Sequence, residues 1–209
     1  VLGLGTGSTA GFAIEALAAR VARGLEIVAI ATSEQSAAQA RRLGIPLTSF
    51  AEHRHIDLTI DGADQVERAT LDLLKGRGGA LLREKIVAAA SERCIIIVDE
   101  EKLAQRLDQP VPVEVAQFGW QATAAALTRL GGDPVLRCAD GARPFVTDGG
   151  NFILDCAFGP IADPPAFERA IKQTVGVIEN GLFIGRSSAV IVGSQGGVEI
   201  IERAAREHP

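Results

Sequence analysis

The sequence predicts an α/β fold: a Rossmann-like parallel sheet with helices on both faces, followed by a smaller ferredoxin-like α+β domain. Three observations support this prediction. Short apolar segments alternate with amphipathic helical segments over the first half, glycine-rich loops run into two of the helices, and the order of elements changes after Pro110-Val111-Pro112. Strand–helix alternation favours parallel pairing, because each crossover helix returns the chain to the same end of the sheet.

The first half is expected to alternate strands with helices. Apolar side chains recur at near-helical spacing from Phe12 to Val21, and Ser33 and Gly44 supply a start and a stop signal for the next helix. The apolar run at 94–98 is typical of a buried strand. In order, we expect strand 1–4, helix 8–23, strand 27–31, helix 33–43, strand 57–60, helix 80–91, strand 95–98 and helix 100–107.

The second half changes to the β-α-β-β-α-β order of a ferredoxin-like unit once a hairpin arm at 144–147 is set aside. Residues 189–192 and 197–206 then look like a strand and a helix that return to the first domain. We therefore expect a catalytic domain from residues 1–111 with 186–209, and a small domain from 112–185 that mediates oligomerisation. The expected elements are strand 113–115, helix 119–130, strand 135–138, strand 144–147, turn 148–150, strand 152–156, helix 164–173 and strand 177–184.

Composition narrows the class of protein. With 209 residues and 47% hydrophobic residues, the chain can bury a full core, and it has no apolar run of membrane-spanning length. A net charge of −5 disfavours nucleic acid and acidic membranes as partners. Three widely spaced cysteines predict free thiols in the cytoplasm rather than zinc ligands. Because the sequence begins inside a strand and contains no methionine, we expect it to lack its natural start.

The glycine-rich segment GLGTGST at residues 3–9 joins a strand to a helix. Such a loop directs unpaired backbone N–H groups, at the positive end of a helix dipole, toward an anion. It fits a dinucleotide fingerprint poorly, because the third glycine position is Ser8 and no acidic residue ends the second strand. The hydroxyls of Thr6, Ser8 and Thr9 suit a terminal phosphate. The alternative is a tight turn in which Ser8 caps the helix.

Two further segments carry charged side chains at the expected ends of strands. DGAD at 61–64 places two carboxylates in a turn, where they are either turn-capping groups or acceptors for sugar hydroxyl protons. KGRGGALLREK at 75–85 places a lysine before a glycine-rich turn and Glu84 on the following helix. Glu84 is either an exposed helix charge or, in a partly apolar pocket, a general base with a raised pKa. His53 and His55 lie in a charged loop and predict no metal site.

These three segments, in this order, resemble type A ribose-5-phosphate isomerase. The resemblance extends to Asp99-Glu100-Glu101-Lys102, to Pro112–Val115, to Thr147–Asn151 and to Gly181-Leu182-Phe183, and it spans essentially the whole chain. It implies interconversion of ribose 5-phosphate and ribulose 5-phosphate in the non-oxidative pentose phosphate pathway, by a homo-oligomer (a dimer or tetramer) without metal or cofactor. Gln65 departs from the family pattern, which has a glutamate there.

The resemblance also implies roles for individual residues. It assigns catalysis to Glu84, Asp61, Asp64 and Lys75. It assigns substrate binding to Thr6, Gly7, Ser8, Thr9, Gly62, Ala63, Gly76, Arg77, Gly78 and Lys102. In the mechanism we expect, Glu84 moves a proton between C2 and C1, Lys75 stabilises charge on oxygen, and Asp61 assists ring opening. Asp64 handles hydroxyl protons, and the phosphate lies on residues 5–9.

Three other functions remain open from the sequence. A non-catalytic sugar-phosphate sensor would use the same anion loop but leave Glu84 and Lys75 unexplained. A nucleotide-dependent oxidoreductase would bind NAD(P), and an acyl-CoA transferase would use a glutamate as nucleophile and form a thioester. Failure to bind NAD(P) would exclude the oxidoreductase, and exchange of a substrate C–H proton with solvent would favour the isomerase over the transferase.

Overall fold

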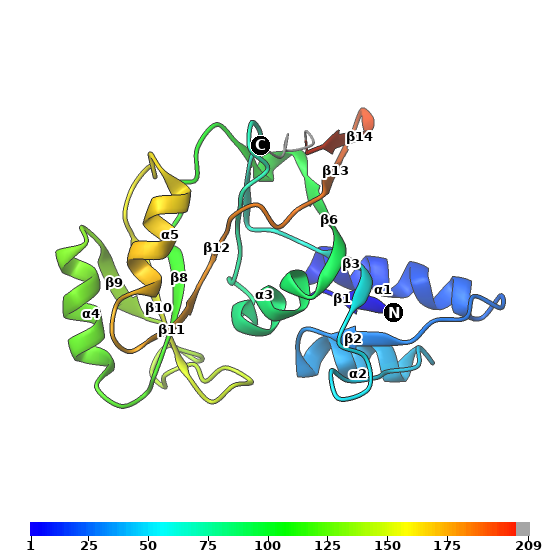
Figure 1. Ribbon diagram of the computed structural model, residues 1–209, viewed down its shortest axis with the longest axis horizontal. Helices are drawn as coiled ribbons and strands as arrows, with labels where there is room; N and C mark the ends of the chain where they lie inside the picture. Colours follow the sequence, from blue (N-terminus) through cyan, green and yellow to red (C-terminus); the bar gives the residue numbers. More distant parts are fainter. Residues whose placement is uncertain (204–209) are drawn as a thin grey trace.

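The largest sheet in the computed structural model, which describes residues 1–203, is mostly parallel. Its strands are β1 (Leu2–Leu4), β2 (Ala29–Ala31), β3 (Ile56–Asp61), β6 (Ser91–Asp99), β13 (Ala189–Ser194) and β14 (Gly197–Glu202). They lie in the order β14-β13-β6-β3-β1-β2, and each neighbouring pair is parallel except β13 with β14 (Figure 1). The predicted parallel sheet is confirmed.

Helices cover both faces of this sheet, as predicted. They are α1 (Ser8–Val21), α2 (Glu34–Arg42) and α3 (Leu81–Ala89). Neighbouring residues of β2 point to opposite faces. Ala29 packs in one buried cluster with Ile14 of α1 and Ala40 of α2, whereas Ile30 packs in another with Val87 of α3. The predicted cap of α2 is also present, because the Ser33 side chain accepts a hydrogen bond from the N–H of Ser36.

The large sheet and its helices form one lobe of the molecule, and a second, antiparallel sheet forms the other. It contains β8 (Val111–Val115), β9 (Asp133–Leu136), β10 (Phe152–Ala157) and β11 (Val177–Asn180), in the order β11-β8-β10-β9. The helices α4 (Trp120–Arg129) and α5 (Pro164–Lys172) complete the ferredoxin-like unit expected from the sequence. Its core is a single apolar cluster that includes Val113, Leu127, Leu154 and Ile171.

A third, short sheet was not predicted. Its strands are β4 (Gln65–Glu67), β5 (Leu73–Leu74), β7 (Leu103–Ala104) and β12 (Leu182–Phe183). The 3₁₀ helix η1 (Glu100–Lys102) precedes β7. The predicted helix 100–107 is therefore wrong, because Leu103 pairs with Val66 of β4 instead of continuing a helix.

Two other expected elements differ in the second half. Residues 197–202 form a strand, not the start of a helix, because Gly197 has a φ of +129° and closes a hairpin in which Ser194 pairs with Gly197. The part of that expected helix at 204–206 lies outside the described residues. The arm at 144–147 makes only an isolated bridge between Cys138 and Pro144, since proline has no N–H to donate to a ladder.

The expected strand 177–184 divides at Gly181 into β11 and β12, which belong to different sheets. A Cβ at Gly181 would lie 2.2 Å from the carbonyl oxygen of Lys75, so only glycine permits this close approach. The N–H of Lys75 donates to the Gly181 carbonyl at 2.9 Å. The crossing of these two backbones therefore fixes Lys75 where the two lobes meet.

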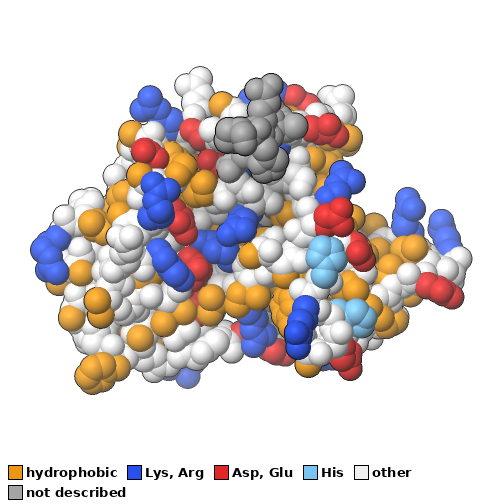
Figure 2. Space-filling view, in the orientation of Figure 1, with side chains coloured by type: hydrophobic (Ala, Val, Ile, Leu, Met, Phe, Trp, Pro, Cys, Tyr) orange, Lys and Arg blue, Asp and Glu red, His pale blue; other side chains and the backbone are white. Residues whose placement is uncertain are grey.

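The remaining observations concern the surface, the cysteines, membrane-spanning helices and the division into domains. Lysine and arginine side chains are visible in the hollow between the two lobes (Figure 2). All three cysteines are free thiols, as predicted. Within residues 1–203, no helix combines the length and apolar character needed to cross a membrane. The division into residues 1–111 with 186–209 and residues 112–185 stays a proposal.

Candidate active site

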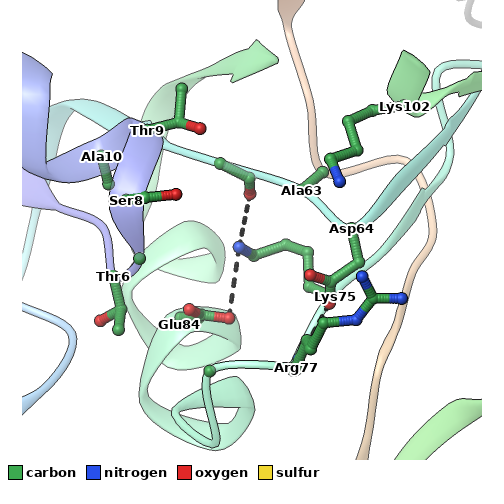
Figure 3. A pocket seen from close by; sticks show the side chains of 14 residues that line it. Thr6, Ser8, Thr9, Ala10, Ala63, Asp64, Lys75, Arg77, Glu84 and Lys102 are labelled. Atoms are coloured by element: carbon green, nitrogen blue, oxygen red, sulfur yellow. Dashed lines mark hydrogen bonds and ion pairs between the residues drawn. The ribbon is translucent and has the colours of Figure 1, made fainter. Parts of the chain in front are cut away.

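A cavity of about 290 Å³ opens where β1 and β3 end. Three loops build it: the turn from β1 into α1, the turn after β3, and the loop that leads into α3 (Figure 3). Ligands of open α/β sheets bind at this end of the strands. The lining residues are Thr6, Gly7, Ser8, Thr9, Ala10, Gly62, Ala63, Asp64, Lys75, Gly76, Arg77, Gly78, Glu84 and Lys102. All the predicted site residues except Asp61 line this one cavity.

The loop before α1 is shaped for an anion. Gly7 is the N-cap residue with a φ of +106°, and no side chain caps the helix, so the first N–H groups stay available. Ser8 is therefore the first helical residue and not the cap. The Ser8 hydroxyl points into the cavity, whereas the Thr6 hydroxyl hydrogen-bonds the hydroxyls of Thr32 and Ser33 at 2.7 and 2.8 Å (Figure 3). Thr6 thus contributes backbone rather than hydroxyl to the site.

Lys75 lies between two buried carboxylates. Its Nζ is 3.1 Å from Asp61 Oδ2 and 3.2 Å from Glu84 Oε2, and it donates a 2.6 Å hydrogen bond to the carbonyl oxygen of Gly62. The Lys75 and Glu84 side chains are each only 4% exposed. The Glu84 contact is close enough for an ion pair but is not aligned as a hydrogen bond, and Oε2 is buried without a hydrogen-bond partner within residues 1–203.

Burial and neighbouring charges set the proton affinities of this trio. Burial raises the pKa of Glu84, Lys75 opposes the rise, and Asp61 adds to it, which leaves the pKa at about 8. Burial alone would lower the pKa of Lys75, but the carboxylates of Asp61 and Glu84 raise it above its ordinary value. Lys75 therefore stays charged, and Glu84 is a far stronger base than an exposed carboxylate.

Asp61 lies beneath the cavity rather than on its wall. Its Oδ1 accepts hydrogen bonds from the N–H groups of Thr6 at 3.1 Å and Gly62 at 2.8 Å, while Oδ2 contacts Lys75. A Cβ at Gly5 would lie 2.0 Å from Asp61 Oδ1, so the glycine lets the first loop approach the carboxylate. Asp61 therefore joins the anion loop to the lysine.

Asp64 occupies the wall of the cavity instead. Its Oδ2 accepts a 2.9 Å hydrogen bond from the N–H of Arg77, which fixes the carboxylate against the glycine-rich loop. Lys102, on η1, also lines the cavity and is only partly buried. The arrangement offers a base, a fixed cation, a second carboxylate and a cradle of backbone N–H groups within one small space.

Sequence reasoning assigned no role to two residues that support this arrangement. The ring of Phe183 lies under both Lys75 and Lys85, with the two Nζ atoms 5.5 and 4.9 Å from the ring centre. Arg137 donates hydrogen bonds to the carbonyls of the 76–77 segment from the other lobe. Phe183 belongs to a segment that carries the family resemblance but had no role assigned, and Arg137 belongs to no such segment. Each is separated from the site along the sequence and meets it only in the folded chain.

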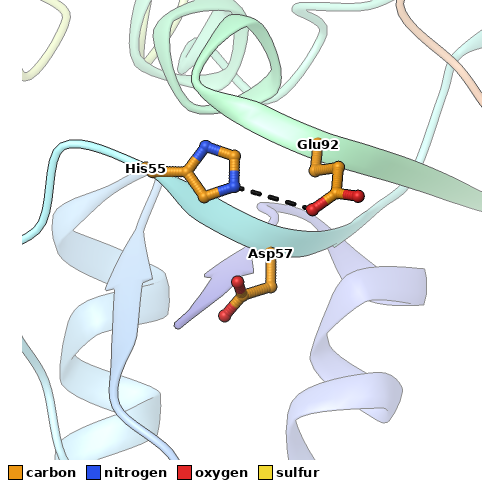
Figure 4. A group of neighbouring side chains, drawn as sticks. All are labelled: His55, Asp57 and Glu92. Carbon is orange, nitrogen blue, oxygen red and sulfur yellow. Dashed lines mark ion pairs between the residues drawn. The ribbon is translucent and has the colours of Figure 1, made fainter.

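A group of potential metal ligands lies at the other end of the large sheet, near the starts of β3 and β6. The donor atoms of His55, Asp57 and Glu92 come within 4.8 Å of one another, and His55 Nε2 is 3.7 Å from Glu92 Oε2 (Figure 4). All three residues are exposed. Charged side chains in water account for this group without a ligand.

Comparison with known proteins gives one consistent family. Residues 28–197 match the family model for ribose 5-phosphate isomerase A (phosphoriboisomerase A). The ribose-5-phosphate isomerase A of Gloeobacter violaceus is 59% identical over 98% of this chain and 90% of its own length. That of Thermomicrobium roseum is 51% identical over 98% of this chain and 87% of its own length.

Solved structures agree with the sequence relatives. A D-ribose-5-phosphate isomerase in complex with phospho-erythronic acid superposes with a TM-score of 0.93 at 40% identity, over 97% of this chain and 90% of its own. The ribose 5-phosphate isomerase A of Methanocaldococcus jannaschii superposes with a TM-score of 0.92 at 38% identity, over 96% of this chain and 90% of its own.

Proposed function

The chain belongs to the ribose 5-phosphate isomerase A family and interconverts ribose 5-phosphate and ribulose 5-phosphate, and we propose that Glu84 is the base of this reaction. One observation carries the proposal: Glu84 Oε2 is buried at the cavity with no hydrogen-bond partner in the described chain. An oxygen with a free lone pair and a raised pKa is suited to take a proton from carbon. Similar relatives give no support to the alternative of a non-catalytic sensor.

The reaction needs a proton moved between neighbouring carbons. In the open-chain aldose, Glu84 takes the C2 proton, the electron pair forms the C1–C2 double bond, and the C1 carbonyl oxygen becomes an enediolate oxygen. The hydroxyl proton then moves from O2 to O1, and return of the Glu84 proton to C1 leaves the carbonyl at C2, which gives the ketose. A glutamate base in a closed site does the same work in triosephosphate isomerase, where the reaction is also an aldose–ketose conversion.

Lys75 is placed to stabilise the charge that develops on oxygen. Its ammonium is held at fixed distances by Asp61 and Glu84, so no reorganisation is needed when the enediolate forms. Since Asp61 does not line the cavity, we propose that it acts through Lys75 and the first loop rather than directly on the sugar ring. Asp64 then remains as the carboxylate for ring opening and hydroxyl protons.

The phosphate would lie on the loop before α1. Its charge of about −1.5 to −2 at neutral pH suits the positive end of the α1 dipole. Gly7, Ser8 and Thr9 supply uncapped N–H groups, and the Ser8 hydroxyl faces the same space. A related isomerase binds phospho-erythronic acid, whose phosphate and carboxylate would match an anion loop and an oxyanion site at the two ends of this cavity.

The proposed reaction is tested by following ribulose 5-phosphate formation from ribose 5-phosphate with EDTA present. We expect turnover that EDTA does not reduce, and incorporation of solvent deuterium at C1 of the ketose. Solvent exchange during turnover separates proton transfer through a carboxylate from a direct hydride shift, which incorporates no solvent hydrogen. Absence of turnover from a chain that folds and still binds phospho-erythronic acid would favour the sensor.

The pH dependence of kcat/KM should report the raised pKa of Glu84. The base must be deprotonated, so kcat/KM is expected to fall as the pH falls through about 8, rather than near the ordinary value of 4.5. Circular dichroism over the same pH range checks that the fold is retained. If kcat/KM of a folded enzyme fell only near pH 4–5, Lys75 would lower the pKa of Glu84 by more than burial raises it.

Oligomeric state and location stay predictions. We propose a homo-oligomer formed through the small α+β lobe and a cytoplasmic location, in keeping with three free thiols. Sedimentation velocity measures the first directly.

A further inference from the structure

We propose that Arg137 is a positioning residue for isomerisation, because it holds the peptide groups of the 76–78 loop with their N–H groups toward the cavity. Arg137 follows β9 and so belongs to the small α+β lobe, whereas the loop belongs to the catalytic site. The inference rests on the proposed function, since it concerns the same cavity.

The Arg137 guanidinium bridges the two lobes with four hydrogen bonds. Its Nη1 donates to the carbonyl oxygens of Gly76 at 2.8 Å and Arg77 at 3.0 Å. Its Nε and Nη2 donate to the two carboxylate oxygens of Asp155 on β10, the first at 2.9 Å. The Arg137 side chain is only 15% exposed. Because the guanidinium is planar and Asp155 holds one edge of it, the remaining nitrogen, Nη1, donates in a fixed direction.

These contacts decide which way two peptide groups face. In a trans peptide the carbonyl and the N–H point in opposite directions, and the described residues contain no cis peptide bond. With the Gly76 carbonyl turned to Arg137, the N–H of Arg77 faces the other way and donates to Asp64. With the Arg77 carbonyl turned to Arg137, the N–H of Gly78 must also face away from it. Gly78 lines the cavity, and its N–H has no hydrogen-bond partner within residues 1–203.

The 76–79 loop needs this restraint because its glycine-rich backbone can adopt several conformations. Gly76 and Gly79 have φ values of +111° and +81°, and Gly78 lies between them. Within the loop, the N–H of Gly79 donates to the Gly76 carbonyl at 2.9 Å, but no hydrogen bond of the loop itself holds the Arg77 carbonyl among the described residues. Because glycine peptides rotate with little steric resistance, the loop alone does not select one direction for the Gly78 N–H. A cation on the carbonyl side also polarises both peptides, which makes the Gly78 N–H a better donor to a developing oxyanion and the Arg77 N–H a better donor to Asp64. Arg137 thus acts on the reaction through the loop, without contact with the sugar.

The test compares Arg137→Met with the unaltered full chain. We expect kcat for ribose 5-phosphate to fall by roughly 10- to 100-fold, with KM changed by less than about threefold, because misplaced donors affect the transition state more than the ground state. Binding of phospho-erythronic acid, measured by calorimetry, should weaken by a larger factor than KM rises. Arg137→Lys should retain the melting temperature but recover little kcat, since one ammonium cannot hold two carbonyls and a carboxylate.

Arg143→Met is the matched control. Arg143 is exposed, lies in the same lobe as Arg137 and pairs only with Asp140 among the described residues, so kcat and KM should match the unaltered enzyme. If Arg137→Met leaves Asp155 unpaired and fails to fold, the same measurements are made on Arg137→Met combined with Asp155→Asn.

Three outcomes would overturn the inference: a folded Arg137 variant with unchanged kcat, equal losses in Arg143→Met, or full recovery of kcat by Arg137→Lys. Absence of turnover in the unaltered enzyme would instead count against the proposed function.

Discussion

Glu84→Gln should abolish isomerisation while the chain stays folded and still binds sugar phosphate. The amide keeps the shape of the side chain but has no basic lone pair, so the C2 proton has no acceptor. General base catalysis contributes roughly 10²- to 10⁴-fold, and we expect kcat to fall by at least that factor. Lys75 retains Asp61 as a partner at 3.1 Å, so its charge remains compensated in the variant.

The measurement combines turnover, melting temperature and affinity for phospho-erythronic acid. Glu101→Gln is the control, because Glu101 is an exposed carboxylate on η1 and should leave all three unchanged. Parallel loss of turnover and binding would remove Glu84 from the role of base and make it a binding residue. Retention of solvent exchange at C1 without Glu84 would assign the base to Asp64.

Lys75→Met should damage both the fold and the reaction. It leaves the carboxylates of Asp61 and Glu84 buried at a few per cent exposure without a cation. Removing one partner from a buried ion pair costs about 3–5 kcal/mol of unfolding free energy. Urea unfolding at pH 7 should show this as a lower midpoint with an unchanged slope. Turnover should fall below detection because the oxyanion loses its cation.

The sign of the pH dependence identifies the cause of this loss. Without Lys75, the folded-state pKa of Glu84 rises further above about 8, so the unfolding free energy of the variant continues to fall above pH 8, where that of the unaltered chain levels off. We therefore expect the stability difference from the unaltered chain to be smaller at pH 7 than at pH 9. Lys102→Met, which removes a cation with no ion pair within residues 1–203, should change KM but not stability. A difference that is constant with pH would point to lost packing of the lysine stem on Phe183 instead.

The local parts of this fold could be predicted, and the parts that depend on distant partners could not. Ser33 and Gly44 delimit α2 through contacts a few residues away, so the sequence alone locates that helix. Glu84 and Lys75 could be found because glycine-rich turns and charges occur together in one segment. The strands β4, β5, β7 and β12 are two or three residues long, and only their pairing across the chain makes them strands.

The same distinction explains which features of the site could not be predicted. A pattern of two carboxylates in DGAD does not reveal that Asp61 contacts Lys75 while Asp64 lines the cavity wall. That difference depends on the N–H groups of Thr6 and Arg77, which come from other loops. Arg137 has no local signal at all, because its partners lie 60 and 61 residues away along the chain.

The position of β13 has a consequence for the order of folding. The antiparallel sheet is built from consecutive elements between Val111 and Asn180, so it can form as soon as that stretch has been synthesised. The large sheet cannot, because β6 must wait for residues 189–194 before its second edge is paired. Until then the run Ile95-Ile96-Ile97 presents an open apolar edge, which favours association between nascent chains. We therefore expect chain release and chaperone occupancy, more than the speed of either sheet alone, to govern the yield of active enzyme during expression.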